Sequence, residues 1–254
     1  MSAIAVVTDE RFVRPVERFF QRPDIHSSIE LLRRRLSASA TILIAGGAIR
    51  NLFIAALYGE APATLDIDIF IGGLPRDFAI GRVLADQHAE ETDLKGIRWY
   101  PRALGLAFDL CRLDDFLVIR SGNLKPTIEN LLTGIDFTMN AVIYDPYHSK
   151  LVEKACLEAV RNRMIDFNSH RIPDKHLIAY RILLMAHKTG FIFSETVFQY
   201  ARTRLDLDTL THLKHLFAAK QGKDEAGVIM GAYQALCRFP SYEAYRSAMR
   251  SMGT

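Results

Sequence analysis

The chain has 254 residues, a formal charge of +3 at pH 7 and 49% hydrophobic residues. This composition excludes collagen-like and disordered proteins, and the length allows one large domain or two smaller ones. No stretch approaches the ~18 consecutive apolar residues of a membrane span. The N-terminus does not resemble a signal peptide, because acidic residues directly follow a short apolar run. Cys111, Cys156 and Cys237 lie far apart in the sequence and form no CxxC pair. We therefore expect a cytoplasmic protein with no membrane contact, no thiolate zinc site and no disulfide-linked partner.

Charge is distributed unevenly along the chain. Residues 61–169 hold 12 basic and 16 acidic side chains, whereas residues 170–254 hold 12 basic and 7 acidic ones. The acidic middle is expected to need cations, and the basic end is typical of a surface that binds a polyanion. Chance variation explains the same difference, and both interpretations stay open.

The first part of the chain alternates between strand and helix patterns. In chain order these are helix 24–36, strand 41–45, helix 48–58, strand 65–71, helix 76–92, strands 106–113 and 116–120, helix 128–134 and strand 137–144. Capping residues support three of the helices: Asp24 or Ser27 for the first, Gly59 for the second and Thr127 for the last. This order predicts an α/β domain over residues 1–145.

From about residue 154 the pattern becomes helical. Helical spacing recurs over residues 176–191, 194–205, 209–219, 225–239 and 241–252, with Asp and Ser caps, Gly190 and Pro240 between the segments. We predict an all-helical domain over residues 146–254.

Asp66 and Asp68 are the first candidates for chemistry. Alternate residues of a strand share a face, so both carboxylates leave one face while Ile67 and Ile69 enter the core from the other. Carboxylates held this close repel each other unless a cation neutralises them, and paired oxygens suit Mg²⁺. A DxD pattern alone is also typical of a solvated strand face, so the neighbouring residues decide between the two interpretations.

The segment before the DxD strand favours a nucleotide site. Gly46 and Gly47 follow a strand and open a helix, an arrangement in which backbone amides and the helix dipole hold a phosphate. Arg50, one turn into that helix, is placed to pair with a triphosphate oxygen. The segment GGAIRN (46–51) is not GxGxxG, which argues against a dinucleotide site.

Asp109 is the candidate third carboxylate. Two-metal phosphoryl transfer usually takes a ligand from a neighbouring strand, and an aspartate is unusual at the centre of the apolar run LAFDLCRL. A position at a sheet edge, facing water, is the alternative for this residue. Together with Asp66 and Asp68, Asp109 predicts a catalytic site for two Mg²⁺ ions.

Three ordered segments, GGAIRN (46–51), LDIDIF (65–70) and IDFTMNAVIYDP (135–146), resemble the head-domain motifs of the class II tRNA nucleotidyltransferases and bacterial poly(A) polymerases. The resemblance covers roughly residues 40–192. It implies a polymerase-beta-like head, in which a five-stranded mixed sheet carries the metal carboxylates, followed by a helical neck that holds the incoming base. It also implies an NTP as substrate and an RNA as acceptor.

The resemblance assigns roles to individual residues. Gly46, Gly47 and Arg50 match the phosphate-binding turn, and Asp66 and Asp68 match the metal ligands.

Two further positions match the motif usually written RRDFTxNA, which the family uses around the sugar and the head–neck junction. Asp136 and Asn140 are its Asp and Asn, whereas Gly134 and Ile135 replace its two arginines.

The base-selecting element EDxxR is only partly present. Arg161 matches its arginine, but Ala159 stands where the family has aspartate. An aspartate acceptor distinguishes C and A from U and G, so we predict weaker or altered base selection. Arg181 is the one arginine that remains of the three in the neck helix.

These observations predict a metal-dependent nucleotidyltransferase that moves an NMP from an NTP to the 3′ end of an RNA such as a tRNA, with release of pyrophosphate. The candidates for sequence-independent contacts with the RNA backbone are Arg202, Arg204, Lys214, Lys220 and Lys223, with a solvated helix face as the alternative. The length leads us to expect no complete tRNA-gripping tail. Two other functions stay open: transfer to a protein or small-molecule hydroxyl, and a catalytically retired RNA-binding module.

Overall fold

The computed structural model describes residues 3–92, 96–102, 104–169 and 174–251. The chain divides into two compact units, one of residues 1–135 and 139–160, the other of residues 136–138 and 161–254. The first unit extends past the predicted boundary at residue 145, because the strand that follows pairs with the strand before it. Over the described ranges, no helix has both the length and the apolar character needed to cross a membrane.

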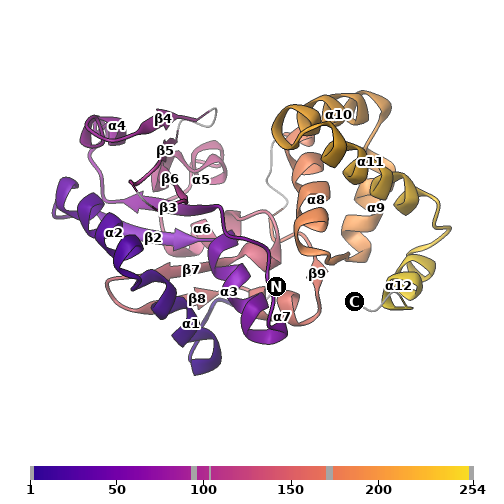
Figure 1. Cartoon of the computed structure of the whole chain (residues 1–254), viewed down its shortest axis with the longest axis horizontal. Coiled ribbons are helices and arrows are strands. Elements are labelled where there is room, and N and C mark those ends of the chain that lie inside the picture. Colours follow the sequence, from indigo (N-terminus) through magenta and orange to yellow (C-terminus); the bar gives the residue numbers. More distant parts are fainter. Residues whose placement is uncertain (1–2, 93–95, 103, 170–173, 252–254) are drawn as a thin grey trace. The chain divides into compact units, whose positions relative to one another are not determined.

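A mixed sheet forms the centre of the first unit (Figure 1). Its strands, in spatial order, are β1 (Ala5–Val6), β8 (Lys150–Glu153), β7 (Val142–Asp145), β2 (Thr41–Ala45), β3 (Asp66–Gly72), β6 (Ala107–Arg112), β5 (Ile97–Trp99) and β4 (Ala89–Glu91). Strands β3 and β6 pair in parallel, and the other neighbours pair antiparallel. Over the described residues the sheet has eight strands rather than the five that the resemblance implies. The strands that were not predicted are β1, β8, β5 and β4, which lie on either side of the predicted ones.

Helices lie along the sheet of the first unit. They are α1 (Glu10–Phe20), α2 (Pro23–Arg35), α3 (Gly47–Tyr58), α4 (Ile80–Val83), α5 (Leu117–Ser121), α6 (Ile128–Gly134) and α7 (Cys156–Arg161), which ends at the boundary between the units. Helix α1 packs on α3 through an edge-to-face contact of Phe12 with Phe53, and both rings are completely buried. These aromatic side chains anchor α3, the helix that follows the Gly46-Gly47 turn.

Strand β3 alternates as its sequence predicts. Ile67, Ile69 and Ile71 are at most 1% exposed, while Asp66 and Asp68 lie half-buried on the opposite face. Leu65 belongs to the predicted strand 65–71, but it precedes the observed strand and is 64% exposed.

The sheet face that carries the carboxylates is polar at one end of β3 and apolar at the other. Away from Asp66 and Asp68, it is apolar and packs against α5 and α6 through a buried cluster that includes Leu43, Ile119 and Leu132. Phe70, the next β3 residue on this face, packs against the cluster. The aspartates follow the same alternation at the other end of β3, where Asp66 keeps 46% of its side chain exposed.

Three sequence-based expectations about the first unit are wrong. Residues 76–92 form only the short helix α4 and strand β4, because β4 pairs with β5. Residues 116–120 belong mainly to helix α5 rather than to a strand, and the adjacent side chains of Val118 and Ile119 are both buried in this helix. Helix α2 begins at Pro23 with no side-chain cap, and Asp24 lies inside its first turn.

The described residues of the second unit are helical apart from one small sheet, in which β9 (Met164–Ile165) and β10 (Ile192–Phe193) pair in parallel. Its helices are α8 (Lys175–Thr189), α9 (Glu195–Arg204), α10 (Leu207–Gln221), α11 (Lys223–Cys237) and α12 (Tyr242–Ser251). Asp174, Ser194 and Asp206 cap the first three of these helices by accepting amide hydrogens, as expected from the sequence. Gly190 ends α8 in the left-handed conformation, with φ of 68°.

Candidate functional site

The sheet register brings Asp109 beside the DxD pair. In the parallel pairing of β3 with β6, Asp68 lies opposite Asp109 and Asp66 lies opposite Ala107. Asp109 lies on an inner strand between β3 and β5, so the alternative of a sheet-edge position is wrong. Among the residues that the structure describes, no three His, Cys, Asp or Glu side chains converge as a metal-binding group.

Arg98 on β5 explains how Asp109 is held. Its Nε and Nη2 donate to the two oxygens of Asp109 at 2.7 and 2.5 Å, which forms a bidentate ion pair. The same Nη2 lies 3.7 Å from an oxygen of Asp66. No sequence motif assigns Arg98 a role at the carboxylates, although its position between Ile97 and Trp99 in a short alternating run was a usable signal.

Two side chains near these carboxylates have raised pKa values, for different reasons. The pKa of Arg98 is raised, chiefly by the hydrogen bonds to Asp109 and further by the charges of Asp109 and Asp66. Burial raises the pKa of the Cys111 thiol to about 12, and nearby carboxylates including Asp115 add to the shift. Arg98 therefore stays a cation, and Cys111 stays a neutral thiol at physiological pH.

The carboxylates Asp66 and Asp68 fit a hard divalent cation. They lie two residues apart on one face of β3, they are half-buried, and their oxygens are the ligand type that Mg²⁺ prefers. Asp109 lies on the same face, but both of its oxygens accept from Arg98. Its role as a third metal ligand stays a prediction.

The Gly46-Gly47 turn adjoins this face of the sheet. Ala45, the last residue of β2, lies opposite Asp68, and a Cβ built on Gly46 would be 3.5 Å from an oxygen of Asp68. Gly46 has φ of 77° and ψ of −126°, a conformation that favours glycine, and it precedes α3 without any side-chain cap. The first amides of α3 have no partners within the helix and carry its positive dipole end. The turn therefore places backbone amides that suit a phosphate next to carboxylates that suit a divalent cation.

Replacing Gly46 with alanine is expected to lower stability by about 1–2 kcal/mol, because the backbone strain falls on a residue with a Cβ. The new methyl group would also lie against Asp68 and weaken nucleotide binding. Gly59→Ala is the matched control, since Gly59 has φ of 84° at the other end of α3 and its Cβ would meet nothing within 4 Å. Chemical denaturation and nucleotide titration should show two losses for Gly46→Ala and a stability loss only for Gly59→Ala; equal nucleotide affinity in both variants would contradict the assignment.

Arg50, in the first turn of α3 after the Gly46-Gly47 turn, is buried in the protein interior. Arg50 is only 4% exposed. Its Nε and Nη2 donate to Oδ1 of Asn51, and its Nη1 donates to Oδ1 of Asn140 at 2.5 Å. Arg50 and Asn140 were expected to contact the nucleotide separately, and the structure brings them together. Direct contact of Arg50 with a triphosphate stays a prediction, whereas the observed hydrogen bonds fix α3 to the segment before β7.

Asp136 and Arg181 also come together, within the second unit. Nε of Arg181 on α8 donates to Oδ2 of Asp136, while Oδ1 of Asp136 accepts from the amide of Phe137. The carboxylate is 8% exposed, so it depends on these donors for its solvation. Arg161 ends α7 in an exposed position, and its role in base selection stays a prediction.

Arg181→Ala is expected to destabilise the protein by about 2 kcal/mol, because it removes a charge-assisted hydrogen bond from a nearly buried carboxylate. Adding Asp136→Asn should recover part of that loss, since a neutral amide costs less to bury. Urea denaturation of both variants provides the measurement. An Arg181→Ala midpoint equal to that of the wild type would show that the ion pair does not stabilise the second unit.

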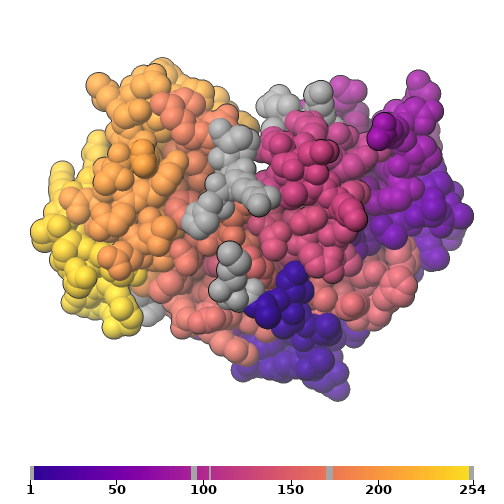
Figure 2. Space-filling model, turned by 180° about the vertical axis from the view of Figure 1, so that it is seen from behind, coloured from indigo at the N-terminus to yellow at the C-terminus, as the bar shows by residue number. Residues whose placement is uncertain are grey.

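The basic residues of the C-terminal helices lie at the surface. All five candidate RNA contacts are exposed: Arg202, Arg204, Lys214, Lys220 and Lys223. The segments that carry them, coloured orange in Figure 2, form part of the outer surface of the second unit. This exposure is compatible with both interpretations of these residues, an RNA-binding surface and a solvated helix face.

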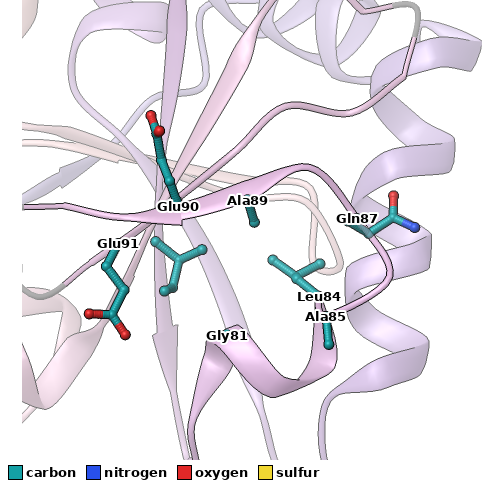
Figure 3. A pocket seen from close by; sticks show the side chains of 8 residues that line it. Gly81, Leu84, Ala85, Gln87, Ala89, Glu90 and Glu91 are labelled. Atoms are coloured by element: carbon teal, nitrogen blue, oxygen red, sulfur yellow. The ribbon is translucent and has the colours of Figure 1, made fainter.

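A cavity of about 270 Å³ lies between α4 and the β4–β5 hairpin. Ile97 lines it, whereas Arg98, the next residue of β5, faces the other side of the strand. Figure 3 shows the same alternation on β4, where Glu90 and Glu91 point in opposite directions. On β5, therefore, Ile97 faces this cavity and Arg98 faces the carboxylates.

Comparison with known proteins places the fold. No family model and no curated protein sequence matches the chain. A CCA-adding enzyme solved in complex with ATP is similar, with a TM-score of 0.60 and 17% identity over 94% of this chain and 57% of that one. The Thermotoga maritima CCA-adding enzyme complexed with tRNA has a TM-score of 0.54 and 17% identity, covering 92% of this chain and 55% of that one. The Bacillus stearothermophilus enzyme with CTP has a TM-score of 0.55 and 18% identity, over 81% and 51% of the two chains.

The chain thus has the fold of CCA-adding enzymes, as the sequence motifs predicted, and spans little more than half the length of these solved structures. The combination of a large mixed sheet with a helical C-terminal part is confirmed.

Proposed function

We propose that the chain is a metal-dependent nucleotidyltransferase that moves an NMP from an NTP to the 3′ end of an RNA in the cytoplasm and releases pyrophosphate. The observation that carries the proposal is the position of the Asp66–Asp68 face directly beside the Gly46-Gly47 turn. One motif suits divalent cations and the other suits phosphates, and phosphoryl transfer needs both at one place. The fold shared with CCA-adding enzymes supports the same reaction class.

Each part of the site has its own role in the proposed reaction. Asp66 and Asp68 bind Mg²⁺, which when bound neutralises phosphate charge and lowers the pKa of the attacking hydroxyl. The amides of the Gly46-Gly47 turn and of the first turn of α3 hold the triphosphate and stabilise the leaving pyrophosphate. Arg50 and Asn140 keep that turn in place. Catalysis then consists of positioning and charge neutralisation, and no side chain forms a covalent bond to the substrate.

The acceptor and the base preference are tested together. The chain is incubated with Mg²⁺ and each of the four α-labelled NTPs, first with total RNA and then with protein or small-molecule hydroxyl acceptors. Label in RNA supports the proposal, and use of NTPs beyond C and A supports the effect predicted for Ala159. Label only in protein or in small molecules would show that the acceptor is not RNA. No transfer from any NTP would favour a catalytically retired RNA-binding module.

The proposed RNA contacts of the second unit predict a salt dependence. Neutralising phosphates with Lys214, Lys220 and Lys223 releases counterions, so RNA affinity should fall steeply as salt rises. A triple Lys→Gln variant at these positions should bind RNA more weakly and with a shallower salt slope. Filter binding at several salt concentrations measures both quantities, and an unchanged slope would assign these lysines to a solvated surface.

A further inference from the structure

The carboxylate face extends beyond the DxD pair onto the β4–β5 hairpin. In the sheet register Glu90 lies opposite Arg98, Arg98 lies opposite Asp109, and Asp109 lies opposite Asp68. Residues directly opposite each other share a face, so these four side chains form one row across four strands. The row places the Arg98 guanidinium among three carboxylates, of which Asp68 is a candidate metal ligand. The other candidate, Asp66, lies outside the row, with an oxygen 3.7 Å from Nη2 of Arg98.

We propose that Arg98 is a phosphate-binding residue of this site and that Asp109 is the positioning residue that holds it, so that Asp66 and Asp68 bind the metal without Asp109. This inference rests on the proposed function and names a residue that the sequence motifs do not include. The ligand it assigns to Arg98 is the triphosphate of the incoming NTP.

The geometry of the ion pair supports this division of roles. Arg98 and Asp109 meet through two parallel hydrogen bonds of 2.7 and 2.5 Å, and the Asp109 side chain is only 24% exposed. A metal bound by Asp109 would have to share oxygens that already accept two charge-assisted hydrogen bonds, and it would lie close to the Arg98 guanidinium, which repels a cation. Asp66 is better placed to bind a cation, because 46% of its side chain is exposed.

Charge balance leads to the same division. Asp66, Asp68, Asp109 and Glu90 carry four formal negative charges and Arg98 carries one positive charge, so the face keeps a net negative charge that attracts a divalent cation. An NTP that enters with its own cation then finds both a metal ion and a guanidinium on the same face. Arginine suits this role because its planar group can contact a carboxylate and a phosphate at the same time.

The hairpin holds Arg98 where a substrate anion can reach it. The Arg98 side chain is 37% exposed, and its ion pair uses Nε and Nη2, so Nη1 takes no part in that pair. Tyr100, two residues along the same face, donates to Glu90 on β4 at 2.8 Å and stacks on His88 with ring centroids 4.8 Å apart. These cross-strand contacts fix the hairpin that presents the guanidinium.

The test compares Mn²⁺ binding with nucleotide binding in the full-length protein. Electron paramagnetic resonance of free Mn²⁺ measures metal affinity without nucleotide, and equilibrium dialysis of labelled ATP with Ca²⁺ measures nucleotide affinity without turnover. The variants are Arg98→Ala, Asp109→Ala, the double variant and Asp66→Asn. Arg35→Ala is the matched control, because Arg35 forms a bidentate pair with Asp86 elsewhere in the first unit.

We expect Arg98→Ala to weaken ATP binding at least about tenfold, as expected for the loss of a charged hydrogen-bonding partner. Asp109→Ala should weaken it similarly, and the double variant should be no worse than Arg98→Ala, because both changes remove one unit. The double variant should bind Mn²⁺ within about threefold of the wild type, since it removes no net charge. The Arg35→Ala control should leave both affinities unchanged.

A double variant that loses Mn²⁺ binding at least tenfold would overturn the inference, because Asp109 would then be a metal ligand. Unchanged ATP affinity in Arg98→Ala would overturn it as well. Failure of the proposed function gives a different result: Asp66→Asn would then bind Mn²⁺ and ATP as the wild type does. Thermal unfolding of each variant confirms that these affinities are measured on folded protein.

Discussion

Asp66→Ala and Asp68→Ala are each expected to lower NMP transfer by about 10³-fold or more, because each removes a proposed ligand of the cation on which phosphoryl transfer depends. Neither substitution should unfold the protein, since both side chains are half-buried and the strand is held by Ile67 and Ile69 on the other face. Transfer of label from α-labelled NTP, followed under single-turnover conditions, is the measurement.

The control for this experiment is Asp114→Ala. Asp114 lies in the same acidic region of the sequence and pairs with Arg112 at 2.8 Å, but it lies beyond the end of β6. We expect this variant to transfer label as the wild type does. Activity within tenfold of the wild type in Asp66→Ala would exclude this face of the sheet as the catalytic site.

Arg50→Ala is expected to produce the largest stability loss among the site residues, about 3 kcal/mol, because it leaves the side-chain oxygens of Asn51 and Asn140 without a charged donor in the interior. The Gly46-Gly47 turn should loosen as a result, so KM for NTP should rise. Chemical denaturation measures the first effect and steady-state kinetics the second.

Two comparisons sharpen the Arg50 prediction. Arg14→Ala removes an arginine whose side chain is 71% exposed and should cost less than about 0.5 kcal/mol, although it breaks an ion pair with Glu10. Arg50→Lys keeps the charge but cannot donate to both amides in the same geometry, so most of the stability loss should remain. An Arg50→Ala variant as stable as Arg14→Ala would show that the buried network does not support the turn.

The local parts of the site could be predicted from the sequence because they depend on short patterns. Strict alternation in β3 placed Asp66 and Asp68 opposite the isoleucines, and the strand–glycine–helix order identified the turn at Gly46. The capped helices of the second unit were predicted for the same reason, since Asp174 and Ser194 are local signals.

Long-range pairing explains what the sequence did not predict. The row that joins Asp68, Asp109 and Arg98 depends on the register of three strands, two of which are separated by more than 30 residues of chain. The predicted helix over 76–92 failed for the same reason, because β4 forms only when β5 is beside it. Arg50 was expected to reach a ligand, yet the tertiary structure supplies two buried amides as its partners.

The proposed function requires that this chain adds a nucleotide to the 3′ hydroxyl of an RNA. The most direct measurement is transfer of label to RNA from α-labelled and γ-labelled NTP, with the RNA either intact or oxidised by periodate to destroy its terminal diol. Label should pass to intact RNA from the α position only, and periodate-treated RNA should accept none. Transfer that is equal with oxidised RNA, or transfer of the γ label, would contradict the account.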